Sequence, residues 1–176
     1  FHPSNYFGHL VIRTQAEARL LTLNDAITVK GDLYYPTADI LQIGNPAITL
    51  FGSVEAYGQP INGDFIFPEI NNSRTINTNE INGNVIFKDR NFGFQNNLTV
   101  NGSFTLTDSA TFSFNQKKLT INGDMIVNNW AQLYMAQAGD TLNVTGLFDH
   151  HPIGDPSLFT DGVTSLTGDF DGDNYS

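Results

Sequence analysis

The sequence of 176 residues contains no cysteine and little positive charge. Without cysteine the chain has no disulfide, no thiolate metal ligand and no thiol nucleophile. Lys and Arg number 8 against 18 Asp and Glu, which gives a formal net charge of -10. Because like charges repel, this balance argues against nucleic acid and anionic membrane surfaces as partners.

Long apolar runs are also absent, although hydrophobic residues make up 40% of the chain. No run reaches the roughly 18 residues of a membrane-spanning helix, so we expect no membrane insertion. Charged residues amount to only 15%, below the roughly 25% of a typical globular domain. The chain begins with Phe1 and shows no signal peptide, which favours a processed or excised piece of a longer protein.

A short phrase recurs along nearly the whole chain: an apolar residue, any residue, glycine, any residue and a second apolar residue. Its glycines are Gly8, Gly31, Gly52, Gly63, Gly83, Gly102, Gly123, Gly146 and Gly168. They lie about 21 residues apart, except for a half-length step of 11 residues between Gly52 and Gly63. A period of this length is typical of solenoids, in which each coil is one repeat.

Apolar and polar residues alternate on both sides of the glycines, as in Leu98, Val100, Phe104 and Leu106. Such alternation predicts strands with one buried face. The four Asn-Gly pairs suit either hairpins of an antiparallel meander or corners of a β-solenoid. Apolar residues fill the same column two before and two after each glycine, as stacked coils require.

We therefore predict an all-β, right-handed parallel β-solenoid over residues 8–170, with the whole chain, 1–176, forming a single domain. Departures from the period predict loops at 68–79 and 149–162, with a milder one at 36–46. Residues 15–21 are interpreted as a capping turn. Insertions in solenoids often lie on one face and form the binding surface.

Asp32, Asp64 and Asp124 directly follow repeat glycines and would stack in a solenoid. Stacked carboxylates suit a polysaccharide hydrolase, and an acidic calcium site with a basic residue suits a lyase. Ser53 and Asn84 occupy the same position, however, as short polar corner residues would. No basic residue lies beside a clear acidic cluster, so the sequence favours a binding protein without enzymatic activity.

Two further groups of residues are candidate metal ligands. Asp169, Asp171 and Asp173 alternate as the carboxylates of calcium loops do, and a solvated tail is the alternative. His150 and His151, with Asp149 and Asp155, form a second candidate, for which an exposed loop is the alternative. For the aspartate group the sequence suggests calcium, and no other cofactor is predicted.

The outward rows flanking the glycines consist of residues with short polar side chains. One row reads Thr28, Thr49, Glu80, Thr99, Thr120, Asn143 and Ser165. A regular Thr and Asn face is a feature of ice-binding solenoids, although charged and aromatic residues interrupt the rows here. A further outward row is largely apolar and reads Val11, Tyr34, Glu55, Ile66, Ile86, Thr105 and Ile126. An exposed apolar stripe indicates a partner, or a covering loop such as 68–79.

Trp130, Gln132 and Tyr134 alternate with the apolar residues Ala131, Leu133 and Met135. If the apolar set faces inward, the aromatic rings face outward on a rigid strand. There they can stack on sugar rings, while amides hydrogen-bond to the sugar hydroxyls. The predicted ligand-binding residues, with two further tyrosines extending the platform, are Trp130, Gln132, Tyr134, Tyr34 and Tyr57. Aromatic cover over a loop is the alternative.

The phrases LTVNGSFTL, LTINGDMIV and AITVKGDLY resemble those of β-helical surface proteins of bacteria. Similar phrases occur in proteins associated with type IV pili and in the tāpirins, which are cellulose-binding adhesins. The resemblance implies a secreted or cell-surface adhesin without catalytic activity, with a polysaccharide surface such as cellulose as its partner. A structural stalk or fibre segment is a further alternative, and the sequence leaves the oligomeric state open.

Overall fold

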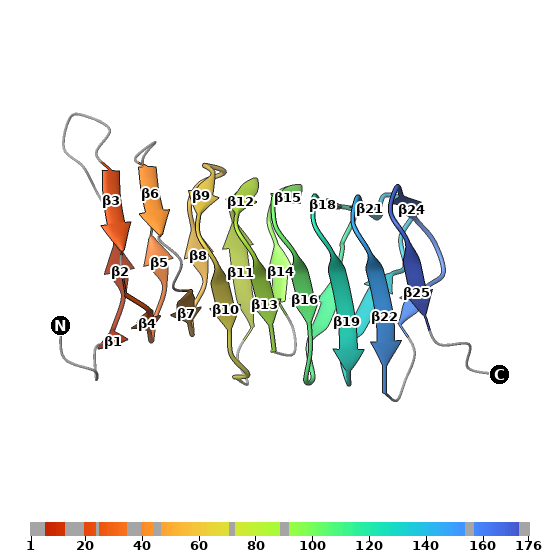
Figure 1. The fold of residues 1–176 in the computed structure, drawn as a ribbon, viewed down its shortest axis with the longest axis horizontal. Coiled ribbons are helices and arrows are strands. Elements are labelled where there is room, and N and C mark those ends of the chain that lie inside the picture. Colours follow the sequence, from red (N-terminus) through yellow and green to blue (C-terminus); the bar gives the residue numbers. More distant parts are fainter. Residues whose placement is uncertain are drawn as a thin grey trace.

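The structure is a computed structural model that describes residues 6–12, 20–23, 25–34, 40–43, 47–70, 73–88, 92–153 and 157–172. The described chain consists of strands, turns and bends, without any helix. It winds into an elongated rod whose first and last strands, β1 (Tyr6–Phe7) and β25 (Phe170–Gly172), lie at opposite ends (Figure 1). No helix in these ranges is long and apolar enough to cross a membrane.

The first side of the rod is a nine-stranded parallel sheet, here called sheet A. Its strands are β1 (Tyr6–Phe7), β4 (Ile27–Val29), β7 (Ile48–Leu50), β10 (Phe65–Phe67), β13 (Val85–Phe87), β16 (Phe104–Leu106), β19 (Met125–Asn129), β22 (Phe148–Pro152) and β25 (Phe170–Gly172). In Figure 1 the strands of sheet A lie side by side, and each crosses the long axis of the rod.

The second side, sheet B, has eight parallel strands. They are β2 (Leu10–Val11), β5 (Leu33–Tyr34), β8 (Val54–Glu55), β11 (Arg74–Asn77), β14 (Phe92–Phe94), β17 (Thr111–Ser113), β20 (Gln132–Met135) and β23 (Leu158–Phe159). Each strand of sheet B follows a strand of sheet A along the chain, which turns the corner between the two sheets.

The third side comprises the six-stranded sheet D and a two-stranded sheet C beside it. Sheet D contains β9 (Ile61–Asn62), β12 (Glu80–Asn82), β15 (Leu98–Val100), β18 (Lys118–Ile121), β21 (Thr141–Val144) and β24 (Val163–Leu166). Sheet C pairs β3 (Leu20–Leu23) with β6 (Ile40–Ile43). A full coil therefore passes through three sheets and three corners.

Every strand pair is parallel, and each strand pairs with its equivalent one coil away. Leu98 of β15, for example, is aligned with Leu119 of β18, which lies 21 residues later. The predicted parallel β-solenoid is confirmed, and the antiparallel meander is excluded for the described chain.

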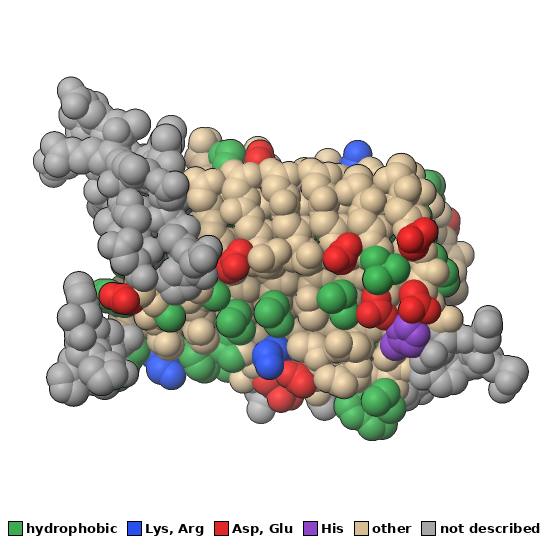
Figure 2. All heavy atoms as spheres, in the orientation of Figure 1, with side chains coloured by type: hydrophobic (Ala, Val, Ile, Leu, Met, Phe, Trp, Pro, Cys, Tyr) green, Lys and Arg blue, Asp and Glu red, His purple; other side chains and the backbone are tan. Residues whose placement is uncertain are grey.

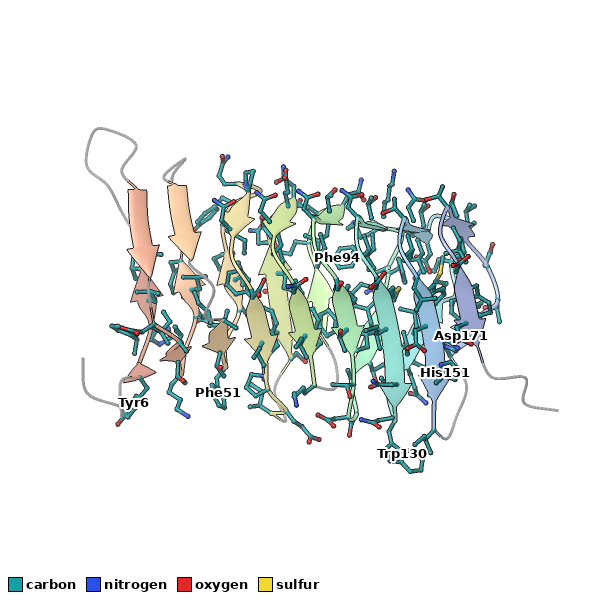
Figure 3. The ribbon with its side chains drawn as sticks, viewed as in Figure 1. Tyr6, Phe51, Phe94, Trp130, His151 and Asp171 are labelled. Atoms are coloured by element: carbon teal, nitrogen blue, oxygen red, sulfur yellow. The ribbon has the colours of Figure 1, made fainter. Side chains whose placement is uncertain are left out.

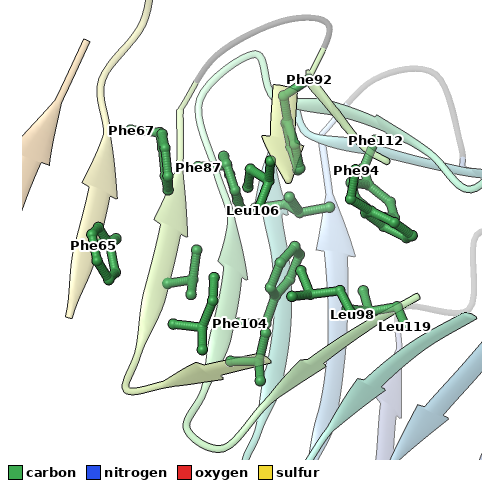
Figure 4. Packing of buried hydrophobic residues seen from close by; sticks show 14 of the residues in the cluster. Phe65, Phe67, Phe87, Phe92, Phe94, Leu98, Phe104, Leu106, Phe112 and Leu119 are labelled. Carbon is green, nitrogen blue, oxygen red and sulfur yellow. The ribbon is translucent and has the colours of Figure 1, made fainter. Parts of the chain in front are cut away.

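The inward side chains of the three sheets meet in one continuous core. In its middle, phenylalanines of successive coils lie on one another (Figure 4). The ring centroids of Phe67 and Phe87 are 4.4 Å apart, with an angle of 12° between the planes. Phe87 also stacks on Phe92 from the neighbouring sheet. These contacts hold the coils in register because each ring packs against the coils above and below it.

The glycines occupy two different corners, which corrects the single column that the sequence predicted. Gly31 and Gly52 lie at the corner between sheets A and B, whereas the repeat glycines from Gly63 to Gly168 lie between sheets D and A. Leu50 is accordingly in sheet A and Ile61 in sheet D. The half-length step between Gly52 and Gly63 moves the glycine corner by one side of the rod.

The predicted loops contain strands of the solenoid. Residues 68–79 contain β11, and residues 149–162 contain most of β22 and all of β23. In the milder case, residues 40–43 form β6, while 36–39 and 44–46 lie outside the described residues. Of the predicted capping turn, residues 15–19 also lie outside them, and Leu20 and Leu21 belong to β3. The sequence did not indicate β11 and β22 because each has a polar residue at an inward position, Arg74 in β11 and His150 in β22.

Arg74 is the clearest inward polar residue, with only 3% of its surface exposed. It aligns with Phe92 of the next coil and donates a hydrogen bond from Nη1 to the Leu50 carbonyl at 3.1 Å. Its Nη2 donates to the Pro68 carbonyl. Thr78, also buried, donates to the carbonyl of Glu80 at 3.0 Å. Hydrogen bonds to the backbone thus allow a polar side chain to be buried in β11 and another directly after it.

Candidate functional site

The aspartates that follow repeat glycines are bonded to the backbone of the next coil. Asp32 Oδ1 accepts the amide N–H of Ser53 at 2.8 Å, and Asp64 Oδ1 accepts that of Asn84 at 2.7 Å. Asp124 Oδ1 accepts the N–H of Leu147 at 2.9 Å. The corner interpretation of these residues is confirmed, since each carboxylate joins two coils.

The asparagines of the Asn-Gly pairs form a second ladder on the outside of the rod. Asn82 Nδ2 donates to Asn62 Oδ1 at 2.8 Å, and Asn101 Nδ2 donates to Asn82 Oδ1 at 2.6 Å. The neighbouring row, proposed for an ice-binding face, is divided: Thr28 and Thr49 lie in sheet A, and its remaining members lie in sheet D. The predicted row is therefore two shorter rows on different sides.

The two adjacent histidines face opposite sides of sheet A. His150 faces inward, where its Nε2 contacts Ser157 Oγ at 2.9 Å and its ring meets Phe148. His151 faces outward and is paired through Nδ1 with Asp149. The predicted metal site that joins both histidines is therefore wrong, because neighbouring residues of a strand point to opposite faces. Asp155 lies outside the described residues.

The predicted calcium ligands are only partly described. Asp171 is aligned with Asp149 of the preceding coil, and its Oδ1 lies 3.7 Å from His151 Nε2. Asp169 precedes β25 at a corner, and Asp173 lies outside the described residues. Within the described ranges no three His, Asp or Glu side chains are grouped so that they could hold a metal ion. The calcium site stays a prediction.

The predicted apolar row is split between two sheets. Ile66, Ile86 and Ile126 are half-buried on the outer face of sheet A, whereas Tyr34 and Glu55 lie on sheet B. Figure 2 shows hydrophobic side chains spaced along the face that sheet A presents. Residues 74–77 belong to sheet B, so the predicted covering loop at 68–79 is not formed there.

Trp130 lies in the turn between β19 and β20, at the corner of sheets A and B, and 63% of its surface is exposed. Its side chain points away from the core (Figure 3). Ile153 occupies the same corner one coil later and is also exposed. The ring is thus accessible and flanked by a second apolar side chain.

Gln132 and Tyr134 lie on the outer face of β20, as the sequence predicted. The residues between and beside them, Ala131, Leu133 and Met135, are buried in the core, which confirms the predicted register. The Tyr134 hydroxyl donates a hydrogen bond to Gln132 Oε1 at 2.8 Å. This bond fixes both half-buried side chains on the sheet surface.

Tyr34 lies on the outer face of β5, and its hydroxyl donates to Asp32 Oδ2 at 3.2 Å. This hydrogen bond, and the negative charge of Asp32, raise the pKa of the Tyr34 phenol above its usual value. Tyr34 and Tyr134 belong to strands five positions apart in sheet B, or about 24 Å at the usual strand spacing. The predicted aromatic residues therefore lie at separate positions on the surface and do not form one continuous platform.

Tyr57 lies in the turn between β8 and β9, at the corner of sheets B and D, with 62% of its surface exposed. It borders an open groove of about 600 Å³. The lining residues are Tyr57, Gly58, Asn77, Asn79, Asn96 and Asn97. Tyr57 was predicted as a ligand-binding residue, but the asparagines of the groove were not. The asparagines come from two successive coils and Tyr57 comes from the coil before them, so only the stacking of the coils brings these residues together.

The same corner contains a buried carboxylate that sequence reasoning missed. Asp140 Oδ1 accepts the N–H of Gln116 at 2.7 Å, and Oδ2 accepts the N–H groups of Ala136 and Gln137 at 2.9 Å and 3.0 Å. Only 1% of the Asp140 surface is exposed. The carboxylate therefore ties the turn before β21 to the turn of the preceding coil.

Replacing Asp140 with alanine is expected to lower the free energy of unfolding by about 2 kcal/mol, because three backbone N–H groups lose a charged acceptor. Urea denaturation followed by circular dichroism measures the loss. The exposed Asp25 provides the control, and Asp25→Ala should change the stability by less than about 0.5 kcal/mol. Equal effects of the two substitutions would contradict the structural role of Asp140.

Comparison with protein-family models, curated proteins and solved structures gave no match for this chain. The observations define a three-sided parallel β-solenoid with exposed aromatic side chains at its corners. The resemblance to bacterial adhesins rests on the repeat phrases alone.

Proposed function

We propose that the protein is an adhesin without catalytic activity that binds an insoluble plant polysaccharide such as cellulose. The observation that carries the proposal is the exposed ring of Trp130, which lies in the turn before β20, a strand whose inward residues are buried. An exposed indole costs solubility and contributes nothing to the core. A sugar ring is a natural partner, since its apolar face stacks on aromatic rings.

The rigid scaffold supports the same conclusion. Tyr134 belongs to strand β20, which pairs with the strands on both sides, and Trp130 lies in the turn that leads into this strand. A side chain on such a scaffold loses little conformational entropy on binding. Each stacked ring contributes only about 1 kcal/mol. Several aromatic positions must therefore bind at once. An extended polysaccharide surface can contact all of them, whereas a small sugar cannot.

The net charge of -10 favours a neutral polysaccharide, because acidic ones such as pectin or alginate would be repelled. The choice of cellulose rests on the resemblance of the repeat phrases to tāpirins. A ligand of this kind is extracellular, so we place the protein outside the cell or at its surface.

A structural stalk or fibre segment is the second candidate function. Sheets A and B each end in an unpaired strand at both ends of the described rod, at β1 and β25 and at β2 and β23. Unpaired parallel edges can accept another strand. Sedimentation velocity over a concentration series tests this candidate: growing assemblies without polysaccharide binding would favour the stalk.

Replacing Trp130 with alanine should weaken retention on insoluble cellulose about fivefold, which is the loss of one stacked ring of about 1 kcal/mol. The melting temperature should stay nearly unchanged, because the ring is exposed. Tyr6→Ala serves as a control, since Tyr6 is equally exposed, at 66%, but lies in β1 near the N-terminal end of the rod.

Unchanged retention of Trp130→Ala would exclude Trp130 from the binding surface. Release of soluble sugars from cellulose, pectin or alginate by the wild-type protein, with or without calcium, would instead show a lyase or hydrolase. An ice-recrystallisation assay tests the ice-binding alternative with the same preparation.

A further inference from the structure

The backbone at Tyr57 has a conformation that bulky side chains rarely adopt. Tyr57 has φ of 51° and Gly58 has φ of 77°, so both residues lie in the left-handed region. The Gln59 amide donates to the Ala56 carbonyl at 2.8 Å, which closes a four-residue turn around them. Glycine and asparagine are the residues that this kind of turn favours. A tyrosine at the first central position is therefore a strained choice.

Equivalent corners of other coils adopt the same conformation without an aromatic residue. At the corner between sheets B and D, Asn115, Gln116 and Gly162 also have φ between 52° and 95°. All three are polar or lack a side chain, and none presents an aromatic ring. Because the fold does not require an aromatic residue at this corner, the tyrosine ring at position 57 needs another explanation.

The surroundings of the Tyr57 ring explain why a tyrosine is present at this corner. The groove beside Tyr57 is lined by neutral amides, several of which are fixed by hydrogen bonds on one side. Asn96 Nδ2 donates to Asn77 Oδ1 at 2.9 Å, and Asn97 Oδ1 accepts the Lys118 N–H at 2.9 Å. Among the described residues, Asn96 Oδ1 and Asn97 Nδ2 have no hydrogen-bond partner, and Asn79 is exposed.

An aromatic ring beside oriented amides matches the chemistry of a sugar ring, with one apolar face and a rim of hydroxyl groups. The lining contains no charged side chain, and Glu55 accepts a hydrogen bond from Asn77 nearby at 3.1 Å. Together with the net charge, these features favour a neutral glycan over an acidic one.

We propose that the groove between Tyr57 and the asparagines Asn79, Asn96 and Asn97 is a binding subsite for one sugar unit of a neutral glucan chain. Tyr57 stacks on the sugar face, and the amides bond to its hydroxyls. The backbone strain at Tyr57 is retained because the ring serves the ligand. This inference deepens the proposed polysaccharide binding and rests on it.

Because Tyr57 is strained, replacing it should affect stability and binding in opposite directions. Tyr57→Asn places a residue suited to the left-handed region at the turn, so the melting temperature should stay the same or rise. Binding to hydroxyethylcellulose, a soluble neutral glucan, should fall about fivefold in affinity electrophoresis, as expected for one stacked ring. Tyr57→Trp keeps an aromatic ring and should bind as the wild-type protein does. The control Tyr6→Ala should leave binding unchanged.

The outcomes separate this subsite from the general function. Binding by the wild-type protein that is weakened by Trp130→Ala but not by Tyr57→Asn would overturn the subsite alone. Failure of the wild-type protein to bind hydroxyethylcellulose and insoluble cellulose would overturn the proposed function. A drop of the melting temperature in Tyr57→Asn would show that the tyrosine is structural. Equal retardation by alginate would overturn the preference for neutral glycans.

Discussion

Replacing Gly83 with alanine is expected to lower the free energy of unfolding by at least about 3 kcal/mol, or to prevent folding. A Cβ atom at this position would lie 2.1 Å from the carbonyl oxygen and 2.4 Å from the carbonyl carbon of Gly63 in the preceding coil. Both contacts are with backbone, which cannot rotate away as a side chain does. The coils would have to separate at this corner, and their strand pairing would weaken.

Gly8 provides a matched control for this prediction. It belongs to the same repeat phrase, but an added Cβ would meet no atom within 4 Å. Gly8→Ala should therefore change the stability by less than about 0.5 kcal/mol. Thermal and urea denaturation of the two variants measure the difference. Similar stabilities would show that the glycine corners are not stacked as described.

Replacing Arg74 with methionine should cost about 3 kcal/mol, since two charge-assisted hydrogen bonds to backbone carbonyls are lost. The structure explains why an arginine is needed at this place. In sheet A, Phe51 N–H donates to the Val29 carbonyl, and Lys88 N–H donates to the Phe67 carbonyl. The equivalent donor for the Leu50 carbonyl would be residue 68, which is proline and has no N–H. Arg74 Nη1 supplies the missing donor.

A double-mutant cycle tests this explanation. Pro68→Ala restores an N–H at the position where the sheet lacks one, so Arg74→Met should cost less in that background. We expect a coupling energy of about 1 kcal/mol, in the range for residues that share a partner. Strictly additive effects would show that Arg74 acts independently of the missing amide.

The solenoid could be predicted from the sequence because its signal is repeated. Alternation such as that of Ala131, Leu133 and Met135 fixes which side of a strand is buried, and the structure confirms it. The glycine period fixes the length of a coil. Strand β11 could not be found in this way, because Arg74 and Thr78 occupy inward positions where apolar residues were expected. Only the distance of 38 residues between Val54 and Phe92, almost two coils, indicated a missing strand.

The candidate site was harder to predict than the fold. The exposed position of Trp130 follows from the buried register of its neighbours and was predicted. The groove at Tyr57 depends on a left-handed turn and on asparagines from successive coils, such as Asn77 and Asn96. The half-length step changes which residues share a corner, so their proximity is not visible in the repeat.

Depletion of the protein from solution by insoluble cellulose is the most direct test of the proposed function. The wild-type protein should bind with a saturable isotherm, Trp130→Ala and Tyr57→Asn should each bind more weakly, and the double variant should stay in the supernatant. Circular dichroism of the same samples should show an unchanged β spectrum. A folded wild-type protein that remains entirely in the supernatant would contradict the account.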